Sequence, residues 1–476
     1  MLPIPPDESR GCVSMQIHFY DLLVAGKSPA EGQVVRFHSI LFKATGAPVE
    51  RRLAMRLRED VQVPAHDIDL NPLSLLEFST GLEETQFSRE VAPLFAAKDT
   101  IHIGLGNTTK LDAYVRHAIY RSLTPISSFT NGVTANFLDL VTLLRALTLL
   151  RPDQVPHGFT GSAKRLDAEI QAATWEWDWD LDNRACGLQA LLVAAFKSAP
   201  KFVEQCVATS SIAAIKAAMA MEGGEVSDFT SVQPVIMVHP SILSPGGFAL
   251  LFPVGTDTNY PDIVFMADLT ADLSALLDPN TRDLGSLVRT GANDARPLHR
   301  VSLSRYPFAA PLKAIRPDDA RRLGVVGSKV RENVHRLRQA SFLAAKLRDE
   351  PLLKLPSLSA DVDHRMWAGD YPHADQQLLK SLEDKELPDW LSHLSNAQDR
   401  RILDLATRVL ARECPHALSS EQLKSWRRHV MTRLDLASPN SLDAHLQALE
   451  NAASEYPTAQ GIEHLLRRAK GFAAQR

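Results

Sequence analysis

The sequence contains few groups of side chains spaced for metal or nucleotide chemistry. Its four cysteines lie far apart and form no CxxC pair, which excludes a zinc ribbon and argues against a disulfide framework. The 16 histidines form no HExxH or HxH group. The glycine-rich stretches lack the Lys-Ser/Thr pair of a phosphate-binding loop. The cysteine usage favours a reducing, cytoplasmic environment. The cysteines are Cys12, Cys186, Cys206 and Cys414.

One segment, residues 313–338, is strongly basic, with eight lysines and arginines against three acidic residues. Such a segment can contact phosphate groups or a carboxylate-rich peptide. By charge alone, a solvated helix face is the simpler interpretation. The basic residues are Lys313, Arg316, Arg321, Arg322, Lys329, Arg331, Arg336 and Arg338.

Three tryptophans, Trp175, Trp177 and Trp179, alternate with acidic residues. Alternation predicts an extended segment with all three rings on one face. The neighbouring acids would repel phosphate, so we do not assign this segment to DNA binding. A buried loop anchor is at least as good an interpretation.

Length and composition limit the class of protein. A chain of 476 residues is too long for a single core, so we expect two or three domains. The formal net charge of −4 does not by itself indicate a nucleic-acid-binding protein. Charged residues interrupt the apolar stretches, so we expect no membrane span. The N-terminal residues show no signal-peptide pattern.

The elements that must position any site follow an order typical of an α+β multidomain protein. Strands are predicted at 15–22, 33–43, 50–59 and 100–105, and helices at 86–97, 109–122, 136–150, 163–173 and 183–197. Residues 231–312 carry short β-rich runs, which fit a small β-barrel-like domain. Helix is predicted again at 317–349 and from 374 to the end.

Several stretches and their spacing resemble the bacterial exonuclease I family, of the DEDD exonuclease superfamily. They are YRSLTP at 120–125, the LLRALTLLRP run ending at Pro152, AIRPDDARRLG at 314–324 and RENVHRLRQ at 331–339. The resemblance implies three domains: an RNase H-like exonuclease domain over 1–199, an SH3-like domain over 200–352 and a helical C-terminal domain over 358–476.

That family cuts single-stranded DNA with two divalent metals, which require several carboxylates and a histidine base. The resemblance places the family's five catalytic positions on residues of which only one is acidic here. They fall on Asp21, Leu23, Leu111, Leu181 and Cys186. We therefore expect no bound cofactor, and Asp21 is the one residual candidate for a metal contact. An Asp at a strand end more commonly caps a turn.

Two neighbouring acids, Asp112 and Asp182, do not rebuild the predicted site. The family has acidic residues at both places in addition to its metal ligands. A step of one residue on a helix also turns a side chain by about 100°. The leucines are expected to make the former metal pocket apolar and to fill it.

The residues that the resemblance assigns to binding are better retained than those that it assigns to catalysis. The family's pocket for the acidic C-terminal tail of the single-stranded-DNA-binding protein places three arginines on Arg151, Arg316 and Arg338. Two other pocket positions have changed, to Gln205 and Pro311. Arg165 matches a family arginine that contacts DNA.

Three hypotheses follow. The first is a catalytically inactive exonuclease I homologue, expected to be a monomer, that binds single-stranded DNA, its binding protein, or both, in repair, recombination or defence. The second is an active 3′→5′ exonuclease that uses Mg²⁺ at ligand positions displaced from those above. The third is a protein-interaction scaffold that no longer contacts DNA.

Overall fold

The computed structural model describes most of the chain. The described residues are 16–43, 45–62, 81–97, 99–106, 111–125, 136–156, 184–221, 226, 229–257, 260, 262–349, 359–434, 439–455 and 460–474. Within them, no helix is both long and apolar enough to cross a membrane.

The first sheet has five strands in the order β3-β2-β1-β4-β5. β1, β2 and β3 pair antiparallel, whereas β4 runs parallel to β1 and β5 parallel to β4. This arrangement confirms the predicted RNase H-like fold. The strands are β1 (Gln16–Ala25), β2 (Gln33–Phe42), β3 (Val49–Ala54), β4 (Thr100–Gly104) and β5 (Asn136–Asp139).

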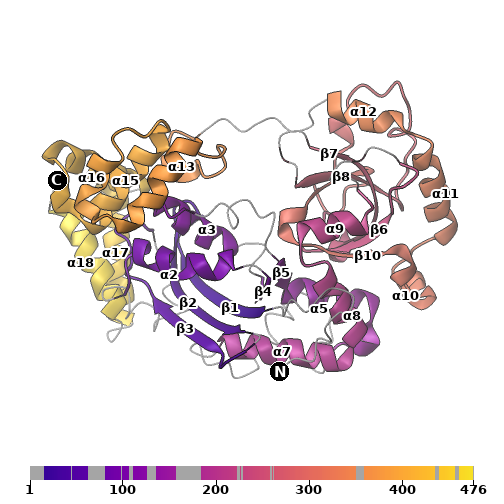
Figure 1. Cartoon of the computed structure of the whole chain (residues 1–476), viewed down its shortest axis with the longest axis horizontal. Coiled ribbons are helices and arrows are strands. Elements are labelled where there is room, and N and C mark those ends of the chain that lie inside the picture. The colour runs from indigo at the N-terminus through magenta and orange to yellow at the C-terminus, as the bar shows by residue number, and fades with distance from the viewer. Residues whose placement is uncertain are drawn as a thin grey trace.

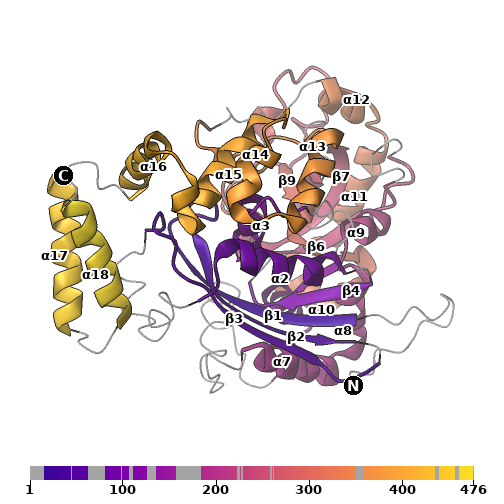
Figure 2. The same cartoon turned by 60° about the vertical axis from the view of Figure 1, so that its left-hand side comes forward.

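Helices cover both faces of this sheet, as Figure 2 shows. α2 (Glu84–Ala96) and α3 (Asp112–Arg121) lie on one face, and α7 (Arg184–Ser198) lies on the other. Alternate residues of β1 divide between the two faces. Tyr20 points toward α2, because its ring packs edge-on against Phe95 at 5.0 Å.

The predicted helix at 136–150 is wrong in its first four residues. Residues 136–139 form β5, and the helix α5 (Leu140–Leu150) begins only after Asp139. The Asp139 side chain accepts the Val141 N–H and so caps the helix. Apolar runs of four residues fit a buried strand as well as a helix, which explains the error.

The second sheet has five antiparallel strands in the order β10-β6-β7-β8-β9, which confirms the predicted SH3-like domain. Two helices that sequence reasoning did not predict lead into it, α8 (Pro200–Ala208) and α9 (Ile212–Ala218). The strands are β6 (Val235–Val238), β7 (Phe248–Thr256), β8 (Ile263–Asp268), β9 (Leu298–Ser302) and β10 (Phe308–Pro311). Three helices follow: α10 (Pro317–Arg322), α11 (Gly327–Arg338) and α12 (Phe342–Asp349).

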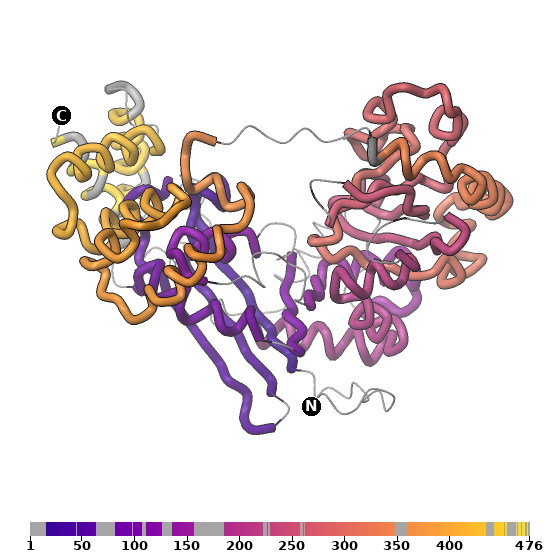
Figure 3. Tube along the Cα trace, turned by 45° about the horizontal axis from the view of Figure 1, so that its top comes forward, coloured from indigo at the N-terminus to yellow at the C-terminus, as the bar shows by residue number. Residues whose placement is uncertain are grey.

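The remaining helices return to the first sheet, far from the second one (Figures 1 and 3). They are α13 (His373–Lys380), α14 (Trp390–His393), α15 (Arg400–Glu413), α16 (Ser420–Arg433), α17 (Pro439–Glu455) and α18 (Gln460–Ala473). A short 3-10 helix, η10 (Val362–His364), precedes them.

Buried ion pairs join these helices to the sheet domain. Asp60, just beyond β3, and Asp363 of η10 are both fully buried. Arg433 of α16 contacts both carboxylates, at 2.6 and 2.7 Å. Arg412 of α15 does the same, at 2.8 and 3.1 Å. Arg412 and Arg433 thus hold Asp60 of the sheet domain across the domain boundary, and they hold Asp363 within the C-terminal part of the chain.

Candidate functional site

The first family catalytic position, Asp21, lies in β1 and is buried. The second, Leu23, points to the same side two residues later. Leu23 packs against an apolar cluster that includes Val35 of β2 and two leucines of the C-terminal helices, Leu449 and Leu465. The position that the resemblance assigns to a family glutamate is therefore part of the packing between the sheet and the C-terminal helices.

A histidine that sequence reasoning missed, His38, lies directly opposite Asp21 in the β1–β2 ladder. Its Nε2 lies 2.9 Å from Glu50 Oε1, and its Nδ1 accepts the Ala185 N–H at 3.3 Å. Both ring nitrogens are engaged, so His38 holds the start of α7 against the sheet and has no ring nitrogen left to serve as a base. Cys186, the next residue of α7, is exposed. Only the strand register brings His38 opposite Asp21, and spacing in the sequence gives no signal of it.

The third position, Leu111, immediately precedes α3 and packs against the main hydrophobic core. The next residue, Asp112, accepts a hydrogen bond of 2.6 Å from the Tyr20 hydroxyl. Tyr20 and Asp21 are adjacent in β1, so their side chains point to opposite faces. Burial raises the pKa of Asp112 to about 6. The hydrogen bond to Tyr20 therefore holds the Asp112 side chain on the face of the first sheet that carries α2.

Within the described residues, one group of three potential metal ligands lies close together: Asp60, Asp363 and His429, with ligand atoms within 4.8 Å of one another. Arg412 and Arg433 already hold both carboxylates. Two guanidinium charges thus occupy the place of a cation, and this group is an interdomain ion-pair network.

The donors described around Asp21 do not fit a pair of divalent metals. Asp21 belongs to no group of three potential ligands among the described residues. Mg²⁺ takes an octahedral shell of oxygen atoms, and two ions need several carboxylates between them. Leu181 and Arg165 lie outside the described residues, as do Trp175, Trp177 and Trp179.

A cavity of about 490 Å³ lies where the tail pocket is predicted. Arg151, Gln205 and Pro311 all line it, so the structure brings these three predicted positions together. Its apolar wall includes the stacked rings of Phe202 and Phe308, whose centroids are 5.0 Å apart. We call this space the Arg151 cavity.

Arg151 is fixed at the edge of α5. Its guanidinium donates to the carbonyl oxygens of Ala314, at 2.8 Å, and Leu150, at 2.5 Å. One of its nitrogens also lies 3.8 Å from the carboxylate of Asp319. Partial burial lowers its pKa, the charge of nearby Arg316 adding to the effect, but a guanidinium stays charged in proteins.

Arg316 lies beside the Arg151 cavity without lining it. Its guanidinium forms a two-point contact with Asp153, at 2.5 and 3.1 Å, and a third contact with Asp319 at 2.6 Å. The hydrogen bonds to these two carboxylates raise the pKa of Arg316. Arg338 ends α11, is exposed and is not among the residues that line the cavity.

Two family models match consecutive parts of the chain. The Exonuclease I SH3-like domain matches residues 228–350, and the Exonuclease I C-terminal domain matches residues 360–476. Among curated proteins, the chain is 24% identical to exodeoxyribonuclease I of Haemophilus influenzae over 395 residues, covering 79% of this chain and 80% of that protein. It is 22% identical to exodeoxyribonuclease I of Escherichia coli over 392 residues, covering 79% of each.

Solved structures agree with these matches across nearly the whole length. The fold is similar to that of E. coli exonuclease I in complex with a dA16 oligonucleotide, with a TM-score of 0.78 at 19% identity, covering 97% of this chain and 99% of that one. It is also similar to exonuclease I in a structure described as SSB/exonuclease I in complex with the inhibitor CFAM, with a TM-score of 0.77 and the same coverage. The chain belongs to the exonuclease I family.

Proposed function

We propose that this chain is a catalytically inactive exonuclease I homologue that binds single-stranded DNA and the acidic tail of a single-stranded-DNA-binding protein. The observation that carries the proposal is the packing of Leu23 and Leu111. The resemblance assigns each to a family ligand position, and each packs against a hydrophobic cluster. Asp21 is the only carboxylate among the four of these positions that the structure describes.

The number of carboxylates that two metal ions require supports the loss of catalysis. Two-metal hydrolysis depends on carboxylates that hold both ions about 3.5–4 Å apart around the attacked phosphate. A single carboxylate cannot hold both ions. His38, the nearest histidine in the strand register, has both ring nitrogens engaged.

The Arg151 cavity supports the binding role. An acidic peptide that also carries an apolar side chain can use an apolar recess beside a cation. Phe202 and Phe308 provide the recess, and Arg151 provides a guanidinium that can form two-point contacts with a carboxylate. A solved relative is described as SSB/exonuclease I in complex with an inhibitor, which supports SSB as the kind of partner.

A fluorescent peptide with the acidic tail sequence of a single-stranded-DNA-binding protein tests this assignment by anisotropy. Arg151→Ala should weaken binding by about tenfold or more, because a hydrogen bond to a charged group contributes about 1.5–3 kcal/mol. Arg321→Ala is the matched control, since it removes an equal charge from exposed α10, where its partner is Asp318. Equal affinities of wild-type protein and Arg151→Ala would contradict the assignment.

The DNA-binding part needs its own measurement. A band-shift titration of an unstructured oligonucleotide should show a complex whose affinity falls as salt rises, as expected when phosphates displace counterions. Absence of any shift at low salt, with the peptide still bound, would instead favour the scaffold that no longer contacts DNA.

A further inference from the structure

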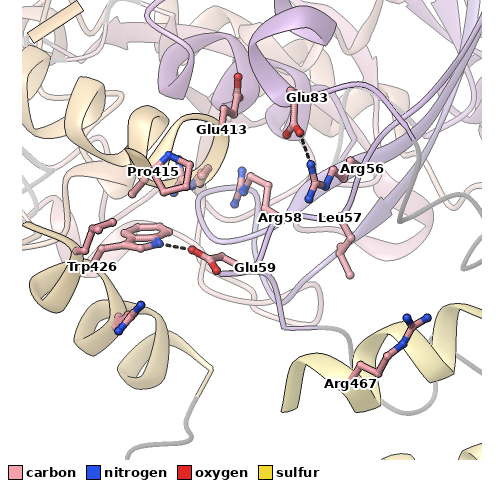
Figure 4. Close-up of a pocket in the computed structure, with 13 residues that line it drawn as sticks. Arg56, Leu57, Arg58, Glu59, Glu83, Glu413, Pro415, Trp426 and Arg467 are labelled. Atoms are coloured by element: carbon pink, nitrogen blue, oxygen red, sulfur yellow. Dashed lines mark hydrogen bonds and ion pairs between the residues drawn. The ribbon is translucent and has the colours of Figure 1, made fainter. Parts of the chain in front are cut away.

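A second cavity, of about 500 Å³, lies between the first sheet and the C-terminal helices. Its walls come from residues 56–59 beyond β3, from Glu83 before α2, from residues 411–427 of α15 and α16, and from Arg467 of α18 (Figure 4). Its volume is that of a small-molecule site. The cavity is separate from Asp21 and from the Arg151 cavity, and the proposed function does not use it. We call it the interdomain cavity.

Five arginines line the interdomain cavity, and two of them form ion pairs with carboxylates that lie outside the lining. Arg58 pairs with Glu84 at 2.6 Å, and Arg412 pairs with Asp60 at 2.8 Å. Neither acid belongs to the cavity lining. The charge of these two arginines is therefore largely compensated within the wall. The five are Arg56, Arg58, Arg412, Arg427 and Arg467.

The three carboxylates of the lining already have partners within the protein. Glu83 pairs with Arg56 at 2.8 Å, and Glu59 accepts the indole N–H of Trp426. The third, Glu413, is held by the backbone N–H and the hydroxyl of Thr85. These acids therefore leave the other lining arginines without a carboxylate partner in the cavity.

Two lining arginines thus have guanidinium N–H groups available for a ligand. Among the described residues, Arg427 of α16 has no hydrogen-bond or ion-pair partner. In the same part of the chain, the one ion-pair partner of Arg467 of α18 is the exposed Glu463 on its own helix, at 3.7 Å. In Figure 4 the Arg467 side chain lies across the opening from Trp426. The buried Nη1 of Arg412, within the wall, also lacks a hydrogen-bond acceptor in the described structure.

From this excess of guanidinium donors we propose that the interdomain cavity binds the phosphate group of a small molecule. Arg427 and Arg467 would supply two-point contacts to the phosphate oxygens, a geometry that suits a planar guanidinium. Leu57, Pro415 and Leu423 form an apolar wall that can accept the body of a phosphate ester. Because the arginines belong to α16 and α18, a bound phosphate links these two helices.

The full-length chain can be tested with inorganic phosphate and with adenosine monophosphate at constant ionic strength, by calorimetry and by thermal shift. Saturable binding that falls by about tenfold or more in Arg427→Ala/Arg467→Ala is expected, because each lost charged hydrogen bond contributes about 1.5–3 kcal/mol. Tighter binding of the nucleotide identifies an ester as the ligand, whereas equal binding identifies free phosphate.

Arg428→Ala is the matched control, because Arg428 is an exposed neighbour on α16 that does not line the cavity. It should bind both probes as the wild type does. Both mutated arginines are exposed, so the double variant should keep the wild-type melting temperature in the absence of ligand. The single substitution Arg427→Gln serves as a milder second variant. Absence of saturable binding by the wild type, or unchanged binding by the folded double variant, overturns the proposal.

Discussion

Asp21 and His38 are cross-strand partners in the β1–β2 ladder, and His38 in turn accepts the N–H of Ala185 at the start of α7. Three of the five positions that the resemblance assigns to catalysis, Asp21, Leu23 and Cys186, thus lie around one junction of two strands and a helix. The fold that carries the family's metal site is present. We propose that the ligand atoms are missing, because the resemblance assigns family carboxylates to positions that are leucine and cysteine here.

Restoring the side chains should therefore restore chemistry. The variant Leu23→Glu/Leu111→Asp/Leu181→His/Cys186→Asp is expected to digest a single-stranded oligonucleotide in Mn²⁺ at a rate clearly above the wild type. The reason is that the restored carboxylates can again hold two ions. The same variant with Asp21→Asn should lose this gain. A folded restored variant with no metal-dependent activity would show that the backbone itself has left the productive geometry.

Asp153 is expected to compete with the tail peptide. Its carboxylate accepts hydrogen bonds from both Nη atoms of Arg316 in an exposed ion pair. Such pairs contribute only about 0–1 kcal/mol to stability. Asp153→Asn should raise the affinity of the acidic peptide about two- to fivefold with little change in melting temperature, consistent with losing an interaction of that size. Asp318→Asn, which removes an exposed acid paired with Arg321, is the control and should leave the affinity unchanged.

The interdomain ion pairs should be costly to break. Arg433→Met leaves Asp60 and Asp363 buried with one fewer guanidinium, and removing one partner of a buried pair costs about 3–5 kcal/mol. Urea denaturation should show this loss. Arg428→Met, at an exposed position of the same helix, should be nearly neutral. Equal stability of the two variants would show that the C-terminal helices are held mainly by apolar packing.

Asp112 should make stability depend on pH. Burial raises its pKa from 3.8 to about 6, so the folded state binds its proton more tightly than the unfolded state. The resulting contribution is fully present below pH 3.8 and is lost as pH rises through about 6. The loss is about 3 kcal/mol at most, at about 1.4 kcal/mol for each pKa unit. Asp112→Asn keeps an acceptor for Tyr20, so its unfolding free energy should fall less than that of the wild type between pH 4 and pH 8.

Much of the fold could be predicted from local patterns. The strands at 16–25 and 33–42 and the helix at 184–198 lie within three residues of their predicted ranges, because their apolar runs and turn residues are distinct. The residues at 136–139 were misassigned, since a short buried strand has the same composition as the helix that follows it. The domain boundaries at 199, 352 and 358 stay predictions.

The candidate site was harder to predict, for a physical reason. Arg151, Gln205 and Pro311 could be placed in one pocket through the family pattern, and they line one cavity. The role of His38 depends on the register of two strands, and the engagement of Arg316 by Asp153 depends on contacts between elements distant in sequence. The interdomain cavity likewise joins segments more than 300 residues apart, as Arg56 and Arg427 show.

The proposed loss of catalysis can be measured with a 3′-labelled single-stranded oligonucleotide incubated with the full-length chain and Mg²⁺ or Mn²⁺. We expect the label to stay on full-length oligonucleotide over the whole time course, including at protein concentrations that retard it in a gel. Release of labelled nucleotide that stops on addition of a chelator would show that this chain is an active exonuclease.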